Sequence, residues 1–394
     1  MARTTTAEFA ASPTAPSSFR WDRLTVASAV SYCLLVAGLS VGVVLGELRD
    51  QFQLSGFVTA LHGSTFGIGL LIIGVVGVGL VDRTGRRVAL TAAAVSISIG
   101  VVMFCTGPTW PVTLTGTALS GLGGALLVMI MPGLISDHHG EHRAAAFAAA
   151  NGAPGVAAVM FSLAIGAALT AQWSWRPIYM ALTAITVLAL AVVARPVKMP
   201  ETSRHGAFSL RHFRDRQRVL IPWFFIVNAV LTEFSVGIWS TAYLKEVGGA
   251  SSGLAPVLAA TFGVMMFVSR LILPITQRIL GEATIAVSFG AVGVGATIMC
   301  FGPGLPLKVA GLAITALGGG PLYPLTVDRL YRRAESSVDS TSLGAIGALA
   351  SGAAVTIGPL SLGVLADTFG LRWAILFVPA LCIVGAVTQR PQSD

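Results

Sequence analysis

Long apolar runs are the feature that most limits how this chain of 394 residues can fold. Many run for about 20 residues, the length of an α-helix that crosses the hydrocarbon core of a bilayer. Only 11% of the residues are charged, and the mean hydropathy is +0.80, so there is too little charge to cover a water-facing surface. A transmembrane β-barrel would show short alternating segments instead. The sequence therefore predicts an all-α integral membrane protein.

Polar breaks divide the chain into twelve predicted spans. In the first half they cover residues 24–46, 56–80, 88–106, 111–131, 144–169 and 177–194. In the second half they cover residues 220–244, 253–274, 283–301, 306–327, 341–365 and 371–388. This predicts a disordered cytoplasmic tail (1–20), an N-terminal six-helix bundle (21–194), a basic cytoplasmic linker (195–219) and a C-terminal six-helix bundle (220–390). The tail has no apolar core, so no signal peptide is expected before the first span.

The loops on the two sides of the predicted spans differ in their basic residues. Of the 25 Lys and Arg residues, 20 fall on one side, seven of them from Arg195 to Arg218, and 5 fall on the other. Positively charged flanks are retained in the cytoplasm, so the basic side is predicted to be cytoplasmic. We expect a multi-pass protein of the inner (cytoplasmic) membrane with both termini inside. The same topology explains the net charge of +8, and no nucleic-acid-binding pattern is present.

Other functional classes find little support in the sequence. No span carries paired carboxylates, an H-E-x-x-H motif or a nucleophile beside a base, so an enzyme is not expected. A channel would need a filter loop or polar rings, and the loops are too short for the sensing domain of a receptor. The four cysteines have no C-x-x-C spacing, so they are predicted to be reduced packing residues and not metal ligands: Cys33, Cys105, Cys300 and Cys382.

An internal duplication relates the two halves. A shift of 195 residues places Cys105-Thr-Gly-Pro-Thr-Trp-Pro111 on Cys300-Phe-Gly-Pro-Gly-Leu-Pro306, and it also places Leu122-Gly-Gly on Leu317-Gly-Gly. Several matches at one offset indicate two diverged copies of a six-helix unit. Two such units, joined by a cytoplasmic loop, form an architecture whose central cleft can open to either side of the membrane.

The loop after the second span carries a recognisable motif. It reads Gly79-Leu-Val-Asp82-Arg83-Thr-Gly85-Arg86-Arg87, which resembles the G-x-L-x-D-R-x-G-R-R signature of the major facilitator superfamily. The resemblance extends from about Trp21 to Arg390. It implies the fold of that family, with twelve transmembrane helices in two six-helix pseudo-repeats, and transport by alternating access.

The same loop is the predicted gate, made of Asp82, Arg83, Gly85, Arg86 and Arg87. Gly85 permits a tight turn, and Asp82 can pair with a basic residue or a helix N-terminus. In the resembled family such contacts hold the halves closed on the cytoplasmic side. The alternative is a turn that serves only topology, although topology alone would not require an aspartate.

Glu233 is the one carboxylate deep within a predicted span. If span seven starts at Leu220, Glu233 lies about 20 Å into a hydrocarbon core of about 30 Å. Desolvation there disfavours the charged carboxylate, which favours reversible proton binding at working pH. We predict that Glu233 couples transport to the transmembrane proton gradient. The alternative is a carboxyl that is permanently neutral or paired and only fixes helix packing.

A polar and aromatic stripe on the same span is the predicted substrate contact. Asn228, Thr232, Trp239 and Tyr243 fall on one helical stripe, whereas Glu233 does not share it. Trp239 and Tyr243 could equally form an interfacial aromatic belt. Tyr32 of span one is expected to contact the ligand from the opposite half, because spans one and four should face spans seven and ten.

Three further residues complete the predicted binding site. His62 of span two is estimated at the depth of Glu233 and could share a proton or ligand with it, or it could be a hydrogen-bonded structural residue. Asn151 of span five lies in a Gly-Pro stretch that partly resembles the antiporter motif of the family. Tyr323 follows Gly318-Gly-Gly-Pro321, where the helix should bend, and it could form part of the cavity wall. Arg270 is expected to reach the cytoplasmic interface instead.

Taken together, these features predict a proton-coupled secondary transporter of a small organic molecule. No cofactor, catalytic residue or metal ion is expected, and the chain is expected to work as a monomer. The partial span-five motif favours export of an amphipathic compound. Thr117 stands where the family's antiporters carry an arginine, so proton-coupled uptake of a sugar-like solute remains the alternative.

Overall fold

The computed structural model describes residues 20–195, 216–334 and 340–387. The predicted tail and most of the predicted linker lie outside these ranges. Within them the regular structure is entirely helical. The N-terminal half comprises α1 (Arg23–Leu39), the short 3₁₀ helices η1 (Ser40–Val44) and η2 (Gly140–His142), and the helices α2 (Leu45–Phe52), α3 (Gly56–Thr84), α4 (Arg86–Thr106), α5 (Trp110–His139), α6 (Arg143–Thr170) and α7 (Trp175–Ala194).

The C-terminal half begins with a π-helical turn, η4 (Arg216–Leu220). It continues with α8 (Ile221–Glu246), α9 (Leu254–Leu280), α10 (Ala283–Phe301), α11 (Gly304–Ala334), α12 (Ser340–Phe369), α13 (Leu371–Ala374) and α14 (Phe377–Val387). Among the described residues, eleven helical segments are long and apolar enough to cross a membrane, the first of them being α1, η1 and α2 together. A shorter apolar segment, Leu371–Gly385, supplies the twelfth. The predicted all-α fold with twelve spans is thus confirmed.

Local chemistry fixes several helix ends. The side chains of Asp22, Ser55 and Ser174 accept hydrogen bonds from backbone N–H groups at the starts of α1, α3 and α7, which satisfies donors that would otherwise be unpaired. Between α3 and α4, Gly85 has a φ of +80°. A side chain is strained at that angle, so glycine allows the tight turn that the sequence predicted there.

The duplication is visible in the helix packing. A Cβ on Gly100 of α4 would lie 2.5 Å from the carbonyl oxygen of Gly116 on α5, so the two backbones cross in close contact. At the offset of 195, a Cβ on Gly295 of α10 would lie 2.6 Å from the carbonyl oxygen of Gly311 on α11. The same glycine pair therefore brings together the equivalent helices of both halves, as small residues do in membrane proteins.

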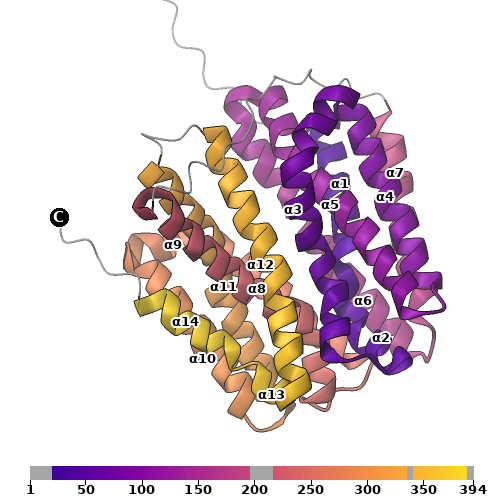
Figure 1. Ribbon diagram of the computed structural model, residues 1–394, viewed down its shortest axis with the longest axis vertical. Helices are drawn as coiled ribbons and strands as arrows, with labels where there is room; N and C mark the ends of the chain where they lie inside the picture. The colour runs from indigo at the N-terminus through magenta and orange to yellow at the C-terminus, as the bar shows by residue number, and fades with distance from the viewer. Residues whose placement is uncertain (1–19, 196–215, 335–339, 388–394) are drawn as a thin grey trace, which may run out of the picture.

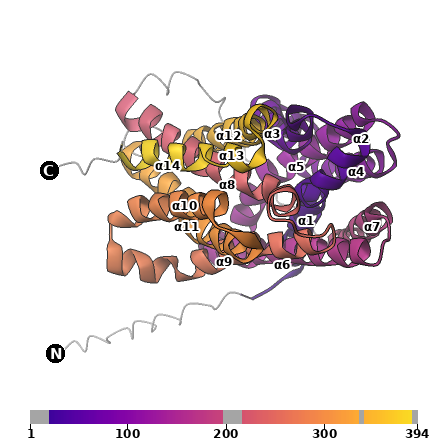
Figure 2. The ribbon, with the colours of Figure 1, turned by 90° about the horizontal axis from the view of Figure 1, so that it is seen from below.

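The two halves pack side by side. Figure 2 shows the N-terminal helices in purple on one side and the C-terminal helices in orange and yellow on the other. Helix α3 packs against α12, α6 packs against α9, and α8 packs against η1 and α2. The linker side is defined here as the end where α1 begins, α7 ends and α8 begins, and the far side as the end with the α2–α3 and α12–α13 connections (Figure 1).

Candidate functional site

A cavity of about 290 Å³ lies between the halves. This volume lies just below the range for small-molecule sites, about 300–1,000 Å³. The N-terminal half contributes lining residues from α1, η1 and α6, and the C-terminal half contributes them from α8 and α9. The walls are mainly apolar, and their polar side chains are Ser40, Ser162, Glu233, Ser240 and Thr241.

Glu233 is the acidic residue of this cavity. It lies twelve residues after Ile221 and thirteen before Glu246, so it is close to the middle of α8. Its side chain is 19% exposed. The sequence estimate placed Glu233 nearer the far side, because it measured depth against a core of about 30 Å, whereas the 26 residues of α8 extend over about 39 Å.

Arg270 of α9 pairs with Glu233. Its guanidinium Nη2 lies 3.4 Å from Glu233 Oε1, at the long limit of a hydrogen bond, and its Nε donates to the carbonyl oxygen of Gly320 at 3.2 Å. Arg270 is therefore not at the membrane interface as expected. The predicted span ended at Pro274, but α9 continues to Leu280, which leaves Arg270 ten residues from the linker-side end.

Tyr323 of α11 lies close to this pair. Its hydroxyl lies near Ser351 of α12, and it is near enough to Glu233 and Arg270 to interact with both electrostatically. Tyr323 is 37% exposed, although it does not belong to the cavity lining. The arrangement forms a polar layer halfway along the C-terminal helices, with an acid, a base and two hydroxyl groups.

The polar stripe of α8 differs from the expectation that it contacts the ligand. Its four side chains are buried inside the C-terminal half. The Trp239 indole donates to the carbonyl oxygen of Pro359 at 3.2 Å, and the Tyr243 hydroxyl donates to that of Met299 at 2.7 Å. Asn228 donates to the carbonyl oxygen of Leu381 at 3.0 Å, and the Thr232 hydroxyl donates to its own helix. None of the four lines the cavity.

Helix geometry explains this difference. Successive residues of an α-helix are rotated by about 100°, so the stripe from Asn228 to Tyr243 and the cavity residues Glu233, Gly237 and Ser240 occupy roughly opposite faces of α8. One of the two faces had to meet the other half. The face with the acid does so, and the aromatic face supplies the core of the C-terminal bundle.

Two predicted ligand contacts in the N-terminal half also lie away from the cavity. His62 is 1% exposed; its Nδ1 is 2.9 Å from the carbonyl oxygen of Val58, and its Nε2 is 3.0 Å from Thr113 Oγ1 on α5. These bonds match the structural alternative for His62. Tyr32 is buried in α1 and is not among the lining residues. Asn151 lies in α6, and its side chain is outside the described part of the chain.

The gate motif lies at the linker side, in the turn from α3 to α4. Arg86 is 7% exposed and pairs with Asp137 of α5 at 2.6 Å, so it holds two helices of the same half together. Asp82, Arg83 and Arg87 are exposed. Neither Asp82 nor Arg83 has a hydrogen bond or ion pair to any residue that the structure describes.

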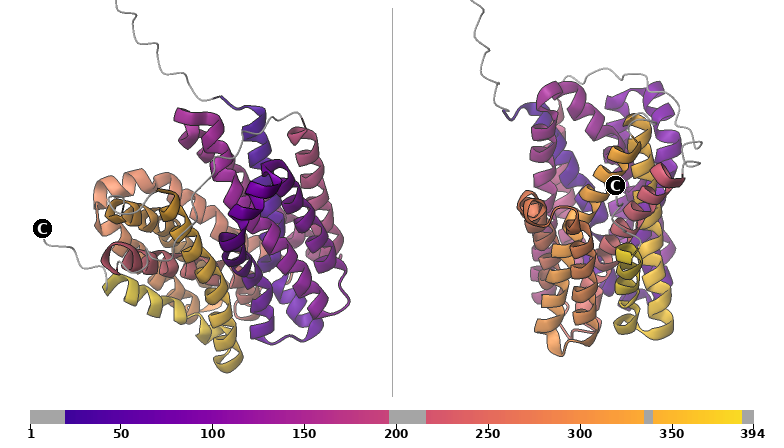
Figure 3. Two further views of the ribbon diagram at one scale, coloured as in Figure 1. Left: turned by 45° about the horizontal axis from the view of Figure 1, so that its top comes forward. Right: turned by 90° about the vertical axis from the view of Figure 1, so that its left-hand side faces the viewer.

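On the far side, by contrast, charged groups join the halves. Lys245 of α8 pairs with Glu47 and, at 2.8 Å, with Asp50 of α2, while Arg49 pairs with Glu246 at 2.9 Å. The carboxylate of Asp367 on α12 accepts hydrogen bonds from the first two backbone N–H groups of α3. Figure 3 (left) shows the two groups of helices diverging away from this end.

Sequence reasoning missed these charged contacts between the halves. Lys245, Glu246 and the Glu47–Asp50 segment flank predicted spans, where charges are ordinary and carry no special signal. An offset of 195 does align Asp50 with Lys245, so opposite charges at equivalent positions of the repeats were the available clue.

Comparison with known proteins places this architecture in context. The family model described as Major Facilitator Superfamily matches residues 25–347. An uncharacterized transporter, y4wD, of Sinorhizobium fredii is 29% identical over 154 residues, which cover 38% of this chain and 39% of that protein. The aligned segment thus spans about two fifths of that relative's length.

Solved structures match over nearly the whole chain. A mutant form of the nucleoside transporter NupG superposes with a TM-score of 0.74 at 13% identity, covering 93% of this chain and 98% of that one. A D-xylose-proton symporter gives a TM-score of 0.69 at 16% identity, covering 93% and 96%. At such identities the likeness establishes the fold.

Proposed function

The chain belongs to the Major Facilitator Superfamily, and from that premise we propose that it is a proton-coupled secondary transporter of a small organic molecule. The observation that carries the proposal is the cavity between the halves, with Glu233 in its wall and Arg270 beside Glu233. An ionisable pair halfway along the helices of a membrane-spanning bundle is costly to maintain, so its presence at a cavity indicates a role in transport.

The transport cycle alternates access to this cavity. The linker side is cytoplasmic in the inner membrane, with both termini inside, in keeping with the distribution of basic residues. In the conformation described above, the far-side charges close the outer end. Substrate binding and proton binding shift the equilibrium between this state and one in which the outer end opens and the gate motif closes the inner end.

Proton coupling works by competition at Glu233 Oε1. When the carboxylate is charged, Arg270 holds it, and the pair compensates for the desolvation of both groups. A proton on Glu233 removes the charge that attracts Arg270. Arg270 keeps its bond to Gly320, so the released side chain of Glu233 can face the cavity and its ligand as a neutral acid. The substrate therefore meets a different cavity wall in each protonation state.

The cavity chemistry favours export of a small amphipathic compound. Most lining residues are apolar, as an amphipathic ligand requires. Uptake of a sugar-like solute is the second candidate, because four hydroxyl groups also line the cavity: Ser40, Ser162, Ser240 and Thr241. Ser40 and Ser240 donate their protons to backbone carbonyl oxygens about one turn earlier in the chain. They can thus accept hydrogen bonds from the hydroxyl groups of such a solute.

The test of coupling uses proteoliposomes that contain a pH-sensitive dye. We expect Glu233→Gln to abolish substrate-induced proton movement while leaving exchange of unlabelled for labelled substrate partly intact, since Gln resembles the neutral acid. Arg270→Gln should also uncouple proton movement. The matched control is Glu282→Gln, which changes an exposed carboxylate at the start of α10. Parent-like proton coupling in Glu233→Gln would refute this role.

Direction is tested in everted and right-side-out membrane vesicles. Ethidium serves as the amphipathic probe and D-xylose as the sugar probe. An exporter that exchanges substrate for protons accumulates ethidium in everted vesicles whose lumen is acid. A symporter accumulates D-xylose in right-side-out vesicles under an inward proton gradient. Accumulation of the sugar and not of the dye would replace export by the second candidate.

A further inference from the structure

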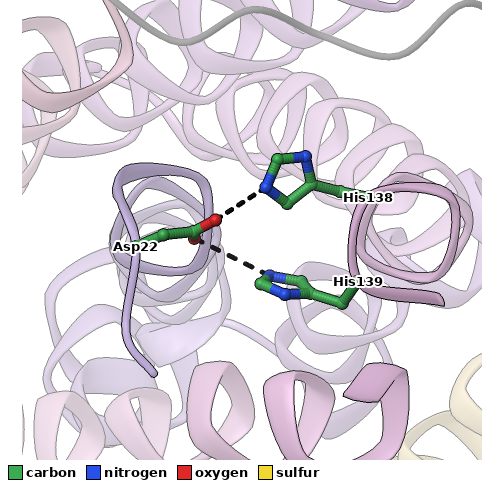
Figure 4. A group of neighbouring side chains, drawn as sticks. All are labelled: Asp22, His138 and His139. Atoms are coloured by element: carbon green, nitrogen blue, oxygen red, sulfur yellow. Dashed lines mark hydrogen bonds and ion pairs between the residues drawn. The ribbon is translucent and has the colours of Figure 1, made fainter. Parts of the chain in front are cut away.

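Three metal-binding side chains converge on the linker side, far from the cavity. Asp22 immediately precedes α1, and His138 and His139 are the last two residues of α5. Asp22 Oδ2 lies 2.6 Å from His138 Nε2, and Asp22 Oδ1 lies 3.7 Å from His139 Nε2. Figure 4 shows the carboxylate of Asp22 facing both rings, with one oxygen directed to each. The gate motif and the cavity use none of these residues.

The spacing of the ligand atoms suits a single divalent metal ion. One carboxylate oxygen and one ring nitrogen from each histidine lie within 4.8 Å of one another. A tetrahedral Zn²⁺ ion with bonds of about 2.0–2.1 Å to nitrogen and oxygen separates neighbouring ligand atoms by about 3.3 Å. The two histidine–aspartate distances fall on either side of that value, so a small rotation of the side chains completes the site.

Hydrogen bonds from a fourth residue, Thr25, position the side chains of this site. The Thr25 hydroxyl and backbone N–H both donate to Asp22 Oδ1 at 2.8 Å, which fixes the carboxylate. Thr25 Oγ1 also lies 2.9 Å from His139 Nε2, a bond that a metal ion at this nitrogen would replace. Both histidines sit at the carboxyl end of α5, where the unpaired carbonyl groups favour a cation.

Adjacent residues on a helix normally diverge, yet these two imidazoles do not. Their ring centroids are 4.8 Å apart and the rings are nearly perpendicular, so Nε2 of each can reach the same point beside Asp22. The side chain of His139 is 9% exposed, whereas those of His138 and Asp22 are 36% and 40% exposed. An ion can therefore enter from the water on the linker side.

We propose that Asp22, His138 and His139 form a binding site for one divalent transition-metal ion of the Zn²⁺ class. Two imidazole nitrogens and one carboxylate oxygen select this class over Mg²⁺ and Ca²⁺, which prefer ligand sets made only of oxygen. Water fills the fourth position. The bound ion ties the start of α1 to the end of α5, and so stabilises the linker-side end of the N-terminal half.

The test uses the purified full-length chain with an affinity tag that contains no histidine. Co²⁺ is titrated and followed by its visible absorption, which reports tetrahedral coordination, and Zn²⁺ is then added as a competitor. We expect one ion per chain and release of protons on binding. His138→Gln, His139→Gln and Asp22→Asn should each weaken Co²⁺ binding at least about tenfold, and Thr25→Val, which leaves all three ligands in place, should weaken it by about 10-fold.

The control is a double variant, His205→Gln with His212→Gln, which removes two histidines of the predicted linker. Unchanged binding in this control and a metal-dependent rise of Tm that is lost in His138→Gln support the site. Each variant is first checked for a cooperative unfolding transition without metal, which shows that it is folded. Equal binding by the parent and the three ligand variants, or binding lost in the control, would overturn the proposal.

Discussion

The two ends of the helix bundle hold the halves in different ways. At the far side, α2 is joined to α8 by ion pairs of Lys245 and Arg49, and α3 is joined to α12 through Asp367. At the linker side, the charged groups with assigned partners connect helices of one half, as Arg86 does with Asp137 and Asp22 does with His138. The charged contacts thus join the two halves at the far side, whereas at the linker side they join helices of the same half.

Close packing beneath the far-side charges reinforces this difference. A Cβ on Gly67 of α3 would lie 2.4 Å from the backbone nitrogen of Thr356 on α12, and one on Gly56 would lie 2.5 Å from the carbonyl oxygen of Gly363. Exposed ion pairs alone contribute only about 0.2–1 kcal/mol each. The shape of the α3–α12 contact must therefore supply much of the closure, and the charges add to it.

The largest expected effect comes from breaking that contact. Gly67→Leu places a side chain where the α12 backbone lies, at a cost of about 1–3 kcal/mol, so the far-side-closed state should lose population by about 5- to 150-fold. A single cysteine at Val43 in the cavity, in a chain without its four native cysteines, should then react with an impermeant maleimide from the far side. Gly290→Leu is the control, because a Cβ added at Gly290 would have no atom of another part of the chain within 4 Å. Unchanged labelling in Gly67→Leu would contradict the idea that close packing of α3 against α12 keeps the far side closed.

A smaller effect is expected from Asp367→Asn. The charged carboxylate accepts two backbone hydrogen bonds at the start of α3, and a neutral amide would accept them less strongly by about 1 kcal/mol, or about fivefold in population. The same labelling assay measures the shift. Asp328→Asn is the control, since Asp328 pairs with Arg332 within α11 and does not join the halves. An equal shift in both variants would mean that Asp367 does not stabilise the far-side-closed state.

Asp82→Asn tests the linker side of the comparison. Asp82 is exposed and unpaired within the described residues. Its replacement should therefore change the free energy of the far-side-closed state by no more than about 0.5 kcal/mol. The opposite state, in which the motif closes the inner end, should become less populated. Transport should slow by a few-fold while substrate affinity stays close to that of the parent. A change confined to affinity would argue against a gating role.

The smallest effect concerns Asp22 and depends on pH. Burial alone raises the pKa of Asp22, but the hydrogen bonds from Thr25 and the contact with His138 outweigh it and lower the pKa from 3.8 to about 2. Ionised Asp22 therefore stabilises the folded state. This stabilisation is fully present above pH 3.8 and is lost as the pH falls to about 2. Without metal, the difference in Tm between the parent and Asp22→Asn should shrink over that interval. Labelling of Val43→Cys should stay unchanged, because Asp22 joins helices of one half.

The predicted depth of individual residues was less reliable than the predicted spans. The proline at 274 looked like the end of a helix, yet α9 passes through it to Leu280, because neighbouring helices in a bundle can satisfy the freed carbonyl. This error moved Arg270 from the middle of the membrane to its edge. The pair of Glu233 and Arg270 could not be found until both helices were placed.

The sequence by itself determined the fold class, the number of spans, the repeat and the family motif. Each of these depends on local or periodic properties: the length of an apolar run, the spacing of glycines, or a turn that requires a positive φ, as at Gly85. Such features can be identified from the local sequence, without knowing which helices pack against one another.

Only the tertiary structure decided which face of α8 meets the cavity. The sequence offered two faces about half a turn apart, one with Glu233 and one with Trp239 and Tyr243, and both were plausible linings. Packing assigned the aromatic face to the core, where the Trp239 indole and the Tyr243 hydroxyl each find a carbonyl acceptor on α12 or α10. Because those acceptors belong to helices more than fifty residues away, no local pattern could have shown them.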